Sequence, residues 1–134
     1  MEKWWGKKMS GIEAETAPKQ GDLIWIDAEP HAGHEYGGHD KENHNIRRPM
    51  LVISSDLYNQ RTGMIVGFPI TSQVPRGFPG ALKIESHKVH GYAILTNLLG
   101  YDYSARSGEV VDHLSKALRL KALAAVKDIF DIFD

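Results

Sequence analysis

Arg48, His34 and Glu35 are the residues of this chain whose side chains are best suited to chemistry. Arg48 carries a planar guanidinium that stays charged and can bind two oxygen atoms of one phosphate or carboxylate. Its pKa of about 12 or higher makes it a poor proton donor or acceptor at neutral pH. His34 titrates near neutral pH, with a reference pKa of roughly 6.5. Glu35 could act as a base only if burial raised its pKa.

A metal site is the first alternative to consider for the histidines. Four of them share one loop with two carboxylates: His31, His34, His39, His44, Asp40 and Glu42. Their spacing matches no standard ligand pattern. The absence of cysteine excludes a thiolate site, a cysteine nucleophile and disulfides. We therefore expect no metal and no cofactor.

The length and composition indicate one ordinary globular domain. The chain has 134 residues, of which 42% are hydrophobic and 25% charged. We expect residues 1–18, which are polar and interrupted by glycine and proline, to form a flexible tail, and residues 19–134 to form the domain. No apolar run reaches the roughly 18 residues of a membrane span, and the first residues do not resemble a secretory signal. These features predict a cytoplasmic protein without a membrane partner.

The formal net charge of −1 argues against broad electrostatic binding of nucleic acid. Any contact with a phosphate backbone must therefore use a local cluster of basic residues.

The hydrophobic pattern predicts short strands followed by one helix. Apolar and β-branched runs favour strands at residues 21–27, 50–54, 64–71, 81–85, 91–98 and 108–111. Residues 30–46 are rich in Gly, His, Asn and Asp and predict a long loop. Asp112 or Ser115 can cap a helix that runs to about Phe130, with an apolar face formed by Leu114, Leu118, Ala122, Ala125, Val126 and Ile129. This order predicts a small, mainly β barrel closed at one end by the C-terminal helix.

Read in order, several short motifs resemble the MazF/PemK toxin family. They cover residues 19–130 and comprise Gly21-Asp22-Leu23-Ile24-Trp25-Ile26-Asp27, Pro30, Gly33-His34-Glu35, Arg48-Pro49, Tyr58-Asn59, Thr62-Gly63-Met64, Pro69-Ile70-Thr71-Ser72-Gln73 and Ala105-Arg106. Each motif alone is common, but their shared order and intervals are specific. The resemblance implies an SH3-like barrel, a homodimer, cleavage of single-stranded RNA at short sequences, and inhibition by a cognate antitoxin.

The resemblance also implies roles for individual residues. Arg48 occupies the position of the catalytic arginine and Thr71 that of the catalytic threonine, while Glu35 and His34 match residues of the first loop. Metal-free cleavage by the 2′-hydroxyl needs a base, an acid and positive charge at the phosphorane. Arg48 would stabilise that charge, Thr71 would position the phosphate or the 2′-hydroxyl, and His34 or Glu35 would transfer the proton. Candidate RNA contacts are Arg47, Ser72, Gln73 and Arg76, with Tyr36 as a base-stacking residue.

Two departures from the family leave other functions open. Relatives often have Asp-Gln where this chain has Thr96-Asn97, and the arginine and aspartate of the PemK branch are replaced by Ile94 and Thr96. Residues 39–45 also enlarge the first loop. The alternatives are a gyrase-poisoning toxin on the same barrel, although the Trp-Gly-Ile ending of those toxins is missing, and a catalytically silent binding module.

Overall fold

The computed structural model describes residues 3–6, 11–28 and 47–132. Within them lie seven strands and two helices. The strands are β1 (Asp22–Asp27), β2 (Arg47–Val52), β3 (Met64–Thr71), β4 (Ala81–Glu85), β5 (His90–Ile94), β6 (Leu99–Asp102) and β7 (Glu109–His113). The helices are α1 (Asp56–Thr62) and α2 (Lys116–Phe130).

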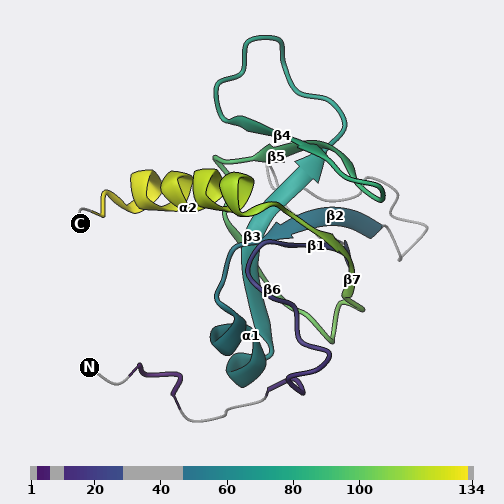
Figure 1. Ribbon diagram of the computed structural model, residues 1–134, viewed down its shortest axis with the longest axis vertical. Helices are drawn as coiled ribbons and strands as arrows, with labels where there is room; N and C mark the ends of the chain where they lie inside the picture. The colour runs from purple at the N-terminus through teal and green to yellow at the C-terminus, as the bar shows by residue number, and fades with distance from the viewer. Residues whose placement is uncertain (1–2, 7–10, 29–46, 133–134) are drawn as a thin grey trace.

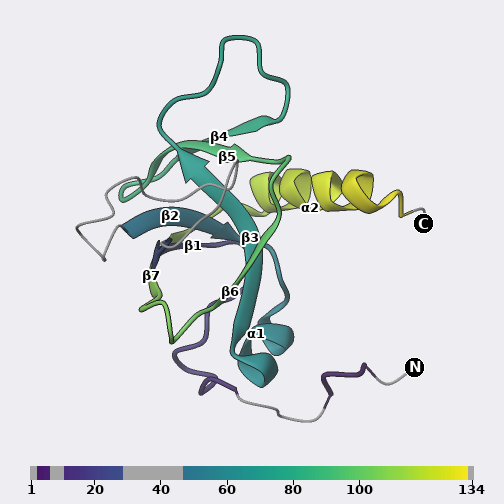
Figure 2. The same ribbon diagram turned by 180° about the vertical axis from the view of Figure 1, so that it is seen from behind.

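All seven strands form one antiparallel, curved sheet in which β3 is the central strand. The order is β4-β5-β3-β2-β1-β7, and β6 lies off this order. Strands β6 and β5 share one edge of β3: β6 pairs with the first half of β3, and β5 pairs with its last two residues. In Figure 1, β3 runs through the middle of the molecule, with α1 at its beginning and β4 and β5 at its end. The view from behind in Figure 2 shows the same arrangement. The predicted mainly β fold with a C-terminal helix, of the SH3-like barrel type, is confirmed.

Two apolar clusters pack against opposite faces of the central strands because successive side chains of a strand alternate between faces. The first contains Leu51, Phe68 and Ile70 and is covered by α2. The second contains Met50 and Ile65, together with residues of β1. The alternation of side chains along each strand therefore determines on which face of the sheet a side chain at a strand end lies.

Helix α2 begins at the residue that the sequence offered as a cap. The Ser115 hydroxyl accepts a hydrogen bond from the Leu118 backbone N–H at 3.3 Å. Ala122 is fully buried against the first cluster, as its place in the predicted apolar face requires. The prediction for Ile129 is wrong, since that side chain is 43% exposed. The helix extends beyond the sheet in Figure 1, so its last turn has no strand beneath it.

The strand predictions missed β6, a four-residue segment that pairs with β3 from Met64 to Gly67. The predicted strand 91–98 ends at Ile94, and β6 begins at Leu99 after a turn. Such a short segment with a central glycine has little periodicity, so only its pairing with β3 defines it. The second strand also begins three residues earlier than predicted, at Arg47.

The described part of the N-terminal segment lies against α1. The rings of Trp5 and Tyr58 are in edge contact, with centroids 5.8 Å apart. The Ile12 backbone N–H donates to the Gln60 carbonyl at 2.8 Å, and the Ile12 side chain packs against the second apolar cluster. The division into a tail of residues 1–18 and a domain of residues 19–134 stays a prediction, but parts of that tail contact the domain.

Asn59 of α1 connects the segment before β1 with the end of β2. It is fully buried, and its amide donates to the carbonyls of Pro18 at 2.9 Å and Ser54 at 3.3 Å. Its side-chain oxygen accepts from the Ser54 hydroxyl at 2.5 Å. A buried amide with three partners fixes the positions of the segments that it joins.

Glycine is required at position 91, where β5 crosses close to the end of β3. The backbone of Gly91 has a φ of +150°, and a Cβ atom there would lie 2.5 Å from the Thr71 carbonyl oxygen. Gly91 therefore allows β5 to approach Thr71.

We predict that Asn59→Ala lowers the free energy of unfolding by about 2–4 kcal/mol, because it leaves several buried polar groups without partners. Urea denaturation measures this change. Asn97→Ala is the matched control, since the side-chain hydrogen bond of Asn97 with Thr96 is at an exposed position. Equal stability of Asn59→Ala and the wild type would contradict the proposed role of this amide.

We predict that Gly91→Ala destabilises the protein by about 1–3 kcal/mol, because the new methyl group collides with Thr71 and the backbone conformation is unfavourable. Gly100→Ala is the control, since a Cβ atom there meets only the Ile65 carbonyl oxygen, at 3.9 Å. Urea denaturation of both variants gives the comparison. A Gly91→Ala protein as stable as Gly100→Ala would show that β5 can move away without cost.

Candidate active site

The two adjacent arginines at the start of β2 point to opposite faces of the sheet. Arg47 forms an ion pair with Asp27 at 3.0 Å and donates to the Trp25 carbonyl at 3.3 Å. A second carboxylate, that of Glu109, lies 3.8 Å from its guanidinium. The RNA contact predicted for Arg47 stays a prediction, and the structure places this guanidinium in contacts within the protein.

Arg48 is exposed and lies at the edge of the face that carries Met50. No hydrogen bond or ion pair of its side chain occurs among the described residues. Strands β2 and β3 pair through Met50 and Pro69. Extending this antiparallel register by two residues sets Arg48 opposite Thr71, and directly opposite residues share a face of the sheet. The β2–β3 pairing itself ends at Met50 and Pro69, so the common face of Arg48 and Thr71 is an inference from the extended register.

Thr71 is the last residue of β3, and its hydroxyl is part of the turn that follows. It accepts from the Gln73 backbone N–H at 3.4 Å and donates to the Gln73 carbonyl at 3.3 Å. Both bonds are long, so the hydroxyl can exchange them for a ligand. Ser72, Gln73 and Arg76 are exposed. They belong to the loop between β3 and β4, which projects beyond β4 in Figures 1 and 2.

Strand pairing adds two residues that the sequence did not single out. Thr71 pairs with Tyr92 of β5, and Tyr92 pairs with Lys83 of β4. Thr71, Tyr92 and Lys83 therefore form a row across three strands, and the extended register of β2 and β3 adds Arg48. We call these four residues the cross-strand row (Arg48, Thr71, Tyr92 and Lys83). Lys83 forms an ion pair with Glu85 at 3.2 Å. The hydrogen bond that Lys83 donates to the Glu85 carboxylate raises the pKa of Lys83 above its usual value.

His34, Glu35 and Tyr36 lie outside the described residues, so their predicted roles stay predictions. The structure does describe the strand end from which their loop begins. Asp27 accepts the Arg47 side chain, and its carbonyl accepts from the Arg106 guanidinium at 3.0 Å. In return the Asp27 backbone N–H donates to the Arg106 carbonyl at 2.9 Å. Two arginines therefore hold the end of β1 in place.

The positions that depart from the family pattern cannot supply an acid–base pair. Ile94 is fully buried, and Thr96 forms a hydrogen bond with Asn97 at 3.0 Å. The Leu95 backbone N–H donates to the Gly80 carbonyl at 2.7 Å, which joins this turn to the base of the β3–β4 loop. These residues support a loop.

Among residues 3–6, 11–28 and 47–132, no group of three or more His, Asp or Glu side chains could hold a metal ion. The four histidines considered as ligands in the sequence belong to residues outside these ranges. In the same described part of the chain, no helix is long and apolar enough to cross a membrane.

Comparison with known proteins agrees with this architecture. Residues 19–130 match the family described as PemK-like, MazF-like toxin of type II toxin–antitoxin system. The endoribonuclease toxin MazF of Escherichia coli (strain K12) is 34% identical over 89 residues, which cover 66% of this chain and 72% of that protein.

Solved structures show the same fold. The crystal structure of MazF (Form-I) from Deinococcus radiodurans superposes with a TM-score of 0.74 at 27% identity, covering 87% of this chain and 98% of that chain. The MazE-MazF (Form-III) structure from the same organism gives a TM-score of 0.71 at 25% identity, covering 87% and 99%. The family match spans the strands, both helices and the cross-strand row. The chain therefore belongs to the PemK-like, MazF-like toxins of type II toxin–antitoxin systems.

Proposed function

We propose that this chain is a toxin endoribonuclease that cleaves single-stranded mRNA at short sequences in the cytoplasm, without a metal ion. The proposal is supported by the register of β2 and β3, which, when extended from Met50 and Pro69 by two residues, sets Arg48 opposite Thr71. The family match over residues 19–130 and the endoribonuclease relative support the choice of RNA as substrate.

The reaction follows from the groups that the site contains. The substrate's 2′-hydroxyl attacks the adjacent phosphorus, and the bond from phosphorus to the 5′-oxygen of the next nucleotide breaks. The products are a 2′,3′-cyclic phosphate and a 5′-hydroxyl. A proton leaves the attacking oxygen and another must reach the leaving oxygen. His34 or Glu35 of the first loop performs the proton transfer.

Arg48 stabilises the negative charge that develops on the phosphorane. Its exposed guanidinium can donate two parallel hydrogen bonds to non-bridging oxygens. Thr71 donates one further hydrogen bond to the phosphate or orients the 2′-hydroxyl, after giving up its weak bond to the Gln73 carbonyl. The charge of Arg48 is effective here because it is not neutralised by a carboxylate among the described residues.

The chain acts as a homodimer and is inhibited by a cognate antitoxin. A toxin of a type II system requires such a partner. An acidic, partly disordered antitoxin segment would compete with RNA for Arg48 and for the loop that carries Arg76.

We predict that Arg48→Ala lowers the cleavage rate about 100- to 1,000-fold, as removal of a donor to a developing oxyanion does. The fold is unaffected because the side chain is exposed. Cleavage of a long transcript measures the rate, and circular dichroism melting checks the fold. Arg48→Lys keeps the charge without the paired donors and should retain an intermediate rate. Lys121→Ala on the exposed side of α2 is the control. A rate within a few-fold of the wild type for Arg48→Ala would refute the assignment.

We predict that cleavage continues unchanged in EDTA and that the upstream fragments end in a cyclic phosphate. The reason is that the proposed reaction uses a guanidinium in place of a metal cation. Mapping the fragment ends by mass spectrometry, with and without the chelator, tests both statements. Loss of activity in EDTA with recovery on addition of a divalent ion would replace this mechanism with a metal-dependent one.

A further inference from the structure

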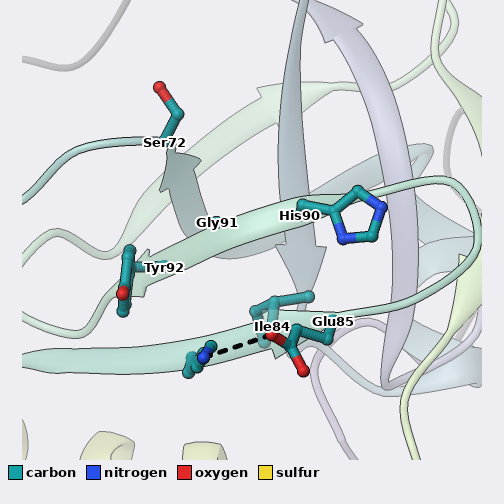
Figure 3. Close-up of a pocket in the computed structure, with 7 residues that line it drawn as sticks. Ser72, Ile84, Glu85, His90, Gly91 and Tyr92 are labelled. Atoms are coloured by element: carbon teal, nitrogen blue, oxygen red, sulfur yellow. Dashed lines mark ion pairs between the residues drawn. The ribbon is translucent and has the colours of Figure 1, made fainter.

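An open hollow of about 220 Å³ lies beside the end of β3, next to Thr71. Its lining includes Ser72, Lys83, Glu85, His90 and Tyr92. Figure 3 shows Tyr92 and His90 on β5, on either side of Gly91. Ser72 lies beyond one edge of β5 and Glu85 lies on β4 along the other. Pockets for drug-sized ligands usually measure about 300–1,000 Å³, so this hollow has room for one small planar group.

Tyr92 gives the hollow an aromatic surface. The side chain is half-buried, and Tyr92 is held from both sides, by pairing of β5 with Thr71 of β3 and with Lys83 of β4. The strand pairing holds the backbone of Tyr92, and its phenol ring can stack on any nucleobase, because every base has a π face.

Lys83 supplies positive charge at the edge of the same hollow. Its ion pair with Glu85 is solvent-exposed, with 65% and 67% of the two side chains accessible, and such pairs are weak. The ammonium has three donors, so a phosphate oxygen can bind while the ion pair persists. Glu85 opposes phosphate binding through its charge, and it therefore limits the affinity of this site.

The place of the hollow in the sheet connects it to the proposed reaction. Arg48, Thr71, Tyr92 and Lys83 occupy successive strands of the cross-strand row. Neighbouring strands lie about 4.8 Å apart, so the extended β2–β3 register implies a backbone separation of about 10 Å between Tyr92 and Arg48. An RNA strand whose scissile phosphate contacts Arg48 and Thr71 can thus place a flanking nucleotide over the hollow.

We propose that this hollow is a nucleotide subsite, in which Tyr92 stacks on a base flanking the cut and Lys83 binds a backbone phosphate. This inference rests on the proposed RNA substrate. It adds that β4 and β5 contact the nucleotides next to the cut. Its side chains touch the RNA away from the reacting phosphate, so it acts on binding and on the choice of cut site.

The test measures the Kd of a short fluorescein-labelled RNA that contains a mapped cut site with a 2′-O-methyl group at the cut position, so that it binds without being cleaved. If no cut is found, a labelled RNA of mixed sequence is used. Stacking on a protein ring contributes about 1–3 kcal/mol per base. Tyr92→Ala should therefore weaken binding about 5- to 150-fold, whereas Tyr92→Phe keeps the ring and should stay within twofold of the wild type.

Substitutions of Lys83 and Glu85 test the contribution of charge to RNA binding. Lys83→Ala should reduce the slope of log Kd against log salt by about 0.7, the value for one phosphate contact with a single strand. Glu85→Gln should strengthen binding, because it frees Lys83 and removes a negative charge. Lys121→Ala, which removes a charge from α2, should leave both the Kd and the slope unchanged. Thermal melting verifies that each variant is folded, and Tyr92→Leu replaces Tyr92→Ala if the latter does not fold.

The outcomes separate this proposal from the proposed function. Cleavage by the wild type, its loss in Arg48→Ala and an unchanged Kd in Tyr92→Ala would retain the nuclease and overturn the subsite. An equal loss of affinity in Tyr92→Ala and Tyr92→Phe would also overturn it, since the ring would then not be the binding element. Binding that depends on the Tyr92 ring, without any cleavage, would keep the subsite and overturn the nuclease. Absence of RNA binding by the wild type overturns both.

Discussion

The pairing of β3 with β2 on one side and β5 on the other is the constraint on which the candidate site depends. It pairs Thr71 with Tyr92, and its register, extended from Met50 and Pro69, sets Arg48 opposite Thr71, although these residues come from three distant parts of the chain. Both contacts need glycine. A Cβ atom at Gly67 would lie 2.0 Å from the Leu51 carbonyl oxygen, and one at Gly91 would lie 2.5 Å from that of Thr71. Close backbone approach on both sides of β3 thus determines where the site can form.

Arg48 and Thr71 could be named from the sequence, but the directions in which neighbouring side chains point could not. Arg47 and Arg48 are adjacent and chemically identical; Arg48 was predicted to be catalytic and Arg47 to contact RNA. Strand alternation separates them: Arg47 meets Asp27 on one face, and Arg48 is exposed on the other. The strand from residue 50 predicted by the apolar run excluded both arginines, so their opposite directions became evident only when β2 was seen to begin at Arg47.

The sequence predicted an element correctly where the residues of that element alone, such as a helix cap or an apolar run, determine its structure. The cap at Ser115 and the apolar run of β3 are such cases, and both are present. Features that arise only from pairing were missed. Strand β6 is too short to show periodicity, and Tyr92 and Lys83 join the site only through the registers of β3–β5 and β4–β5. The resemblance to the toxin family predicted the barrel, but it could not indicate residues that lie outside the family's motifs.

For the proposed RNA substrate, the charges around the site favour selective binding over general attraction in a protein of net charge −1. Several cations near the row are already engaged: Arg47 by Asp27, Lys83 by Glu85, and Arg106 by the Asp27 carbonyl. In the proposed complex, these partners partly compensate the positive charge near the row, so we expect non-specific attraction for the phosphate backbone to be weak. Affinity must then come from contacts that depend on base stacking and geometry. Such contacts form only where the RNA fits, so weak general attraction favours cleavage at a limited set of sequences.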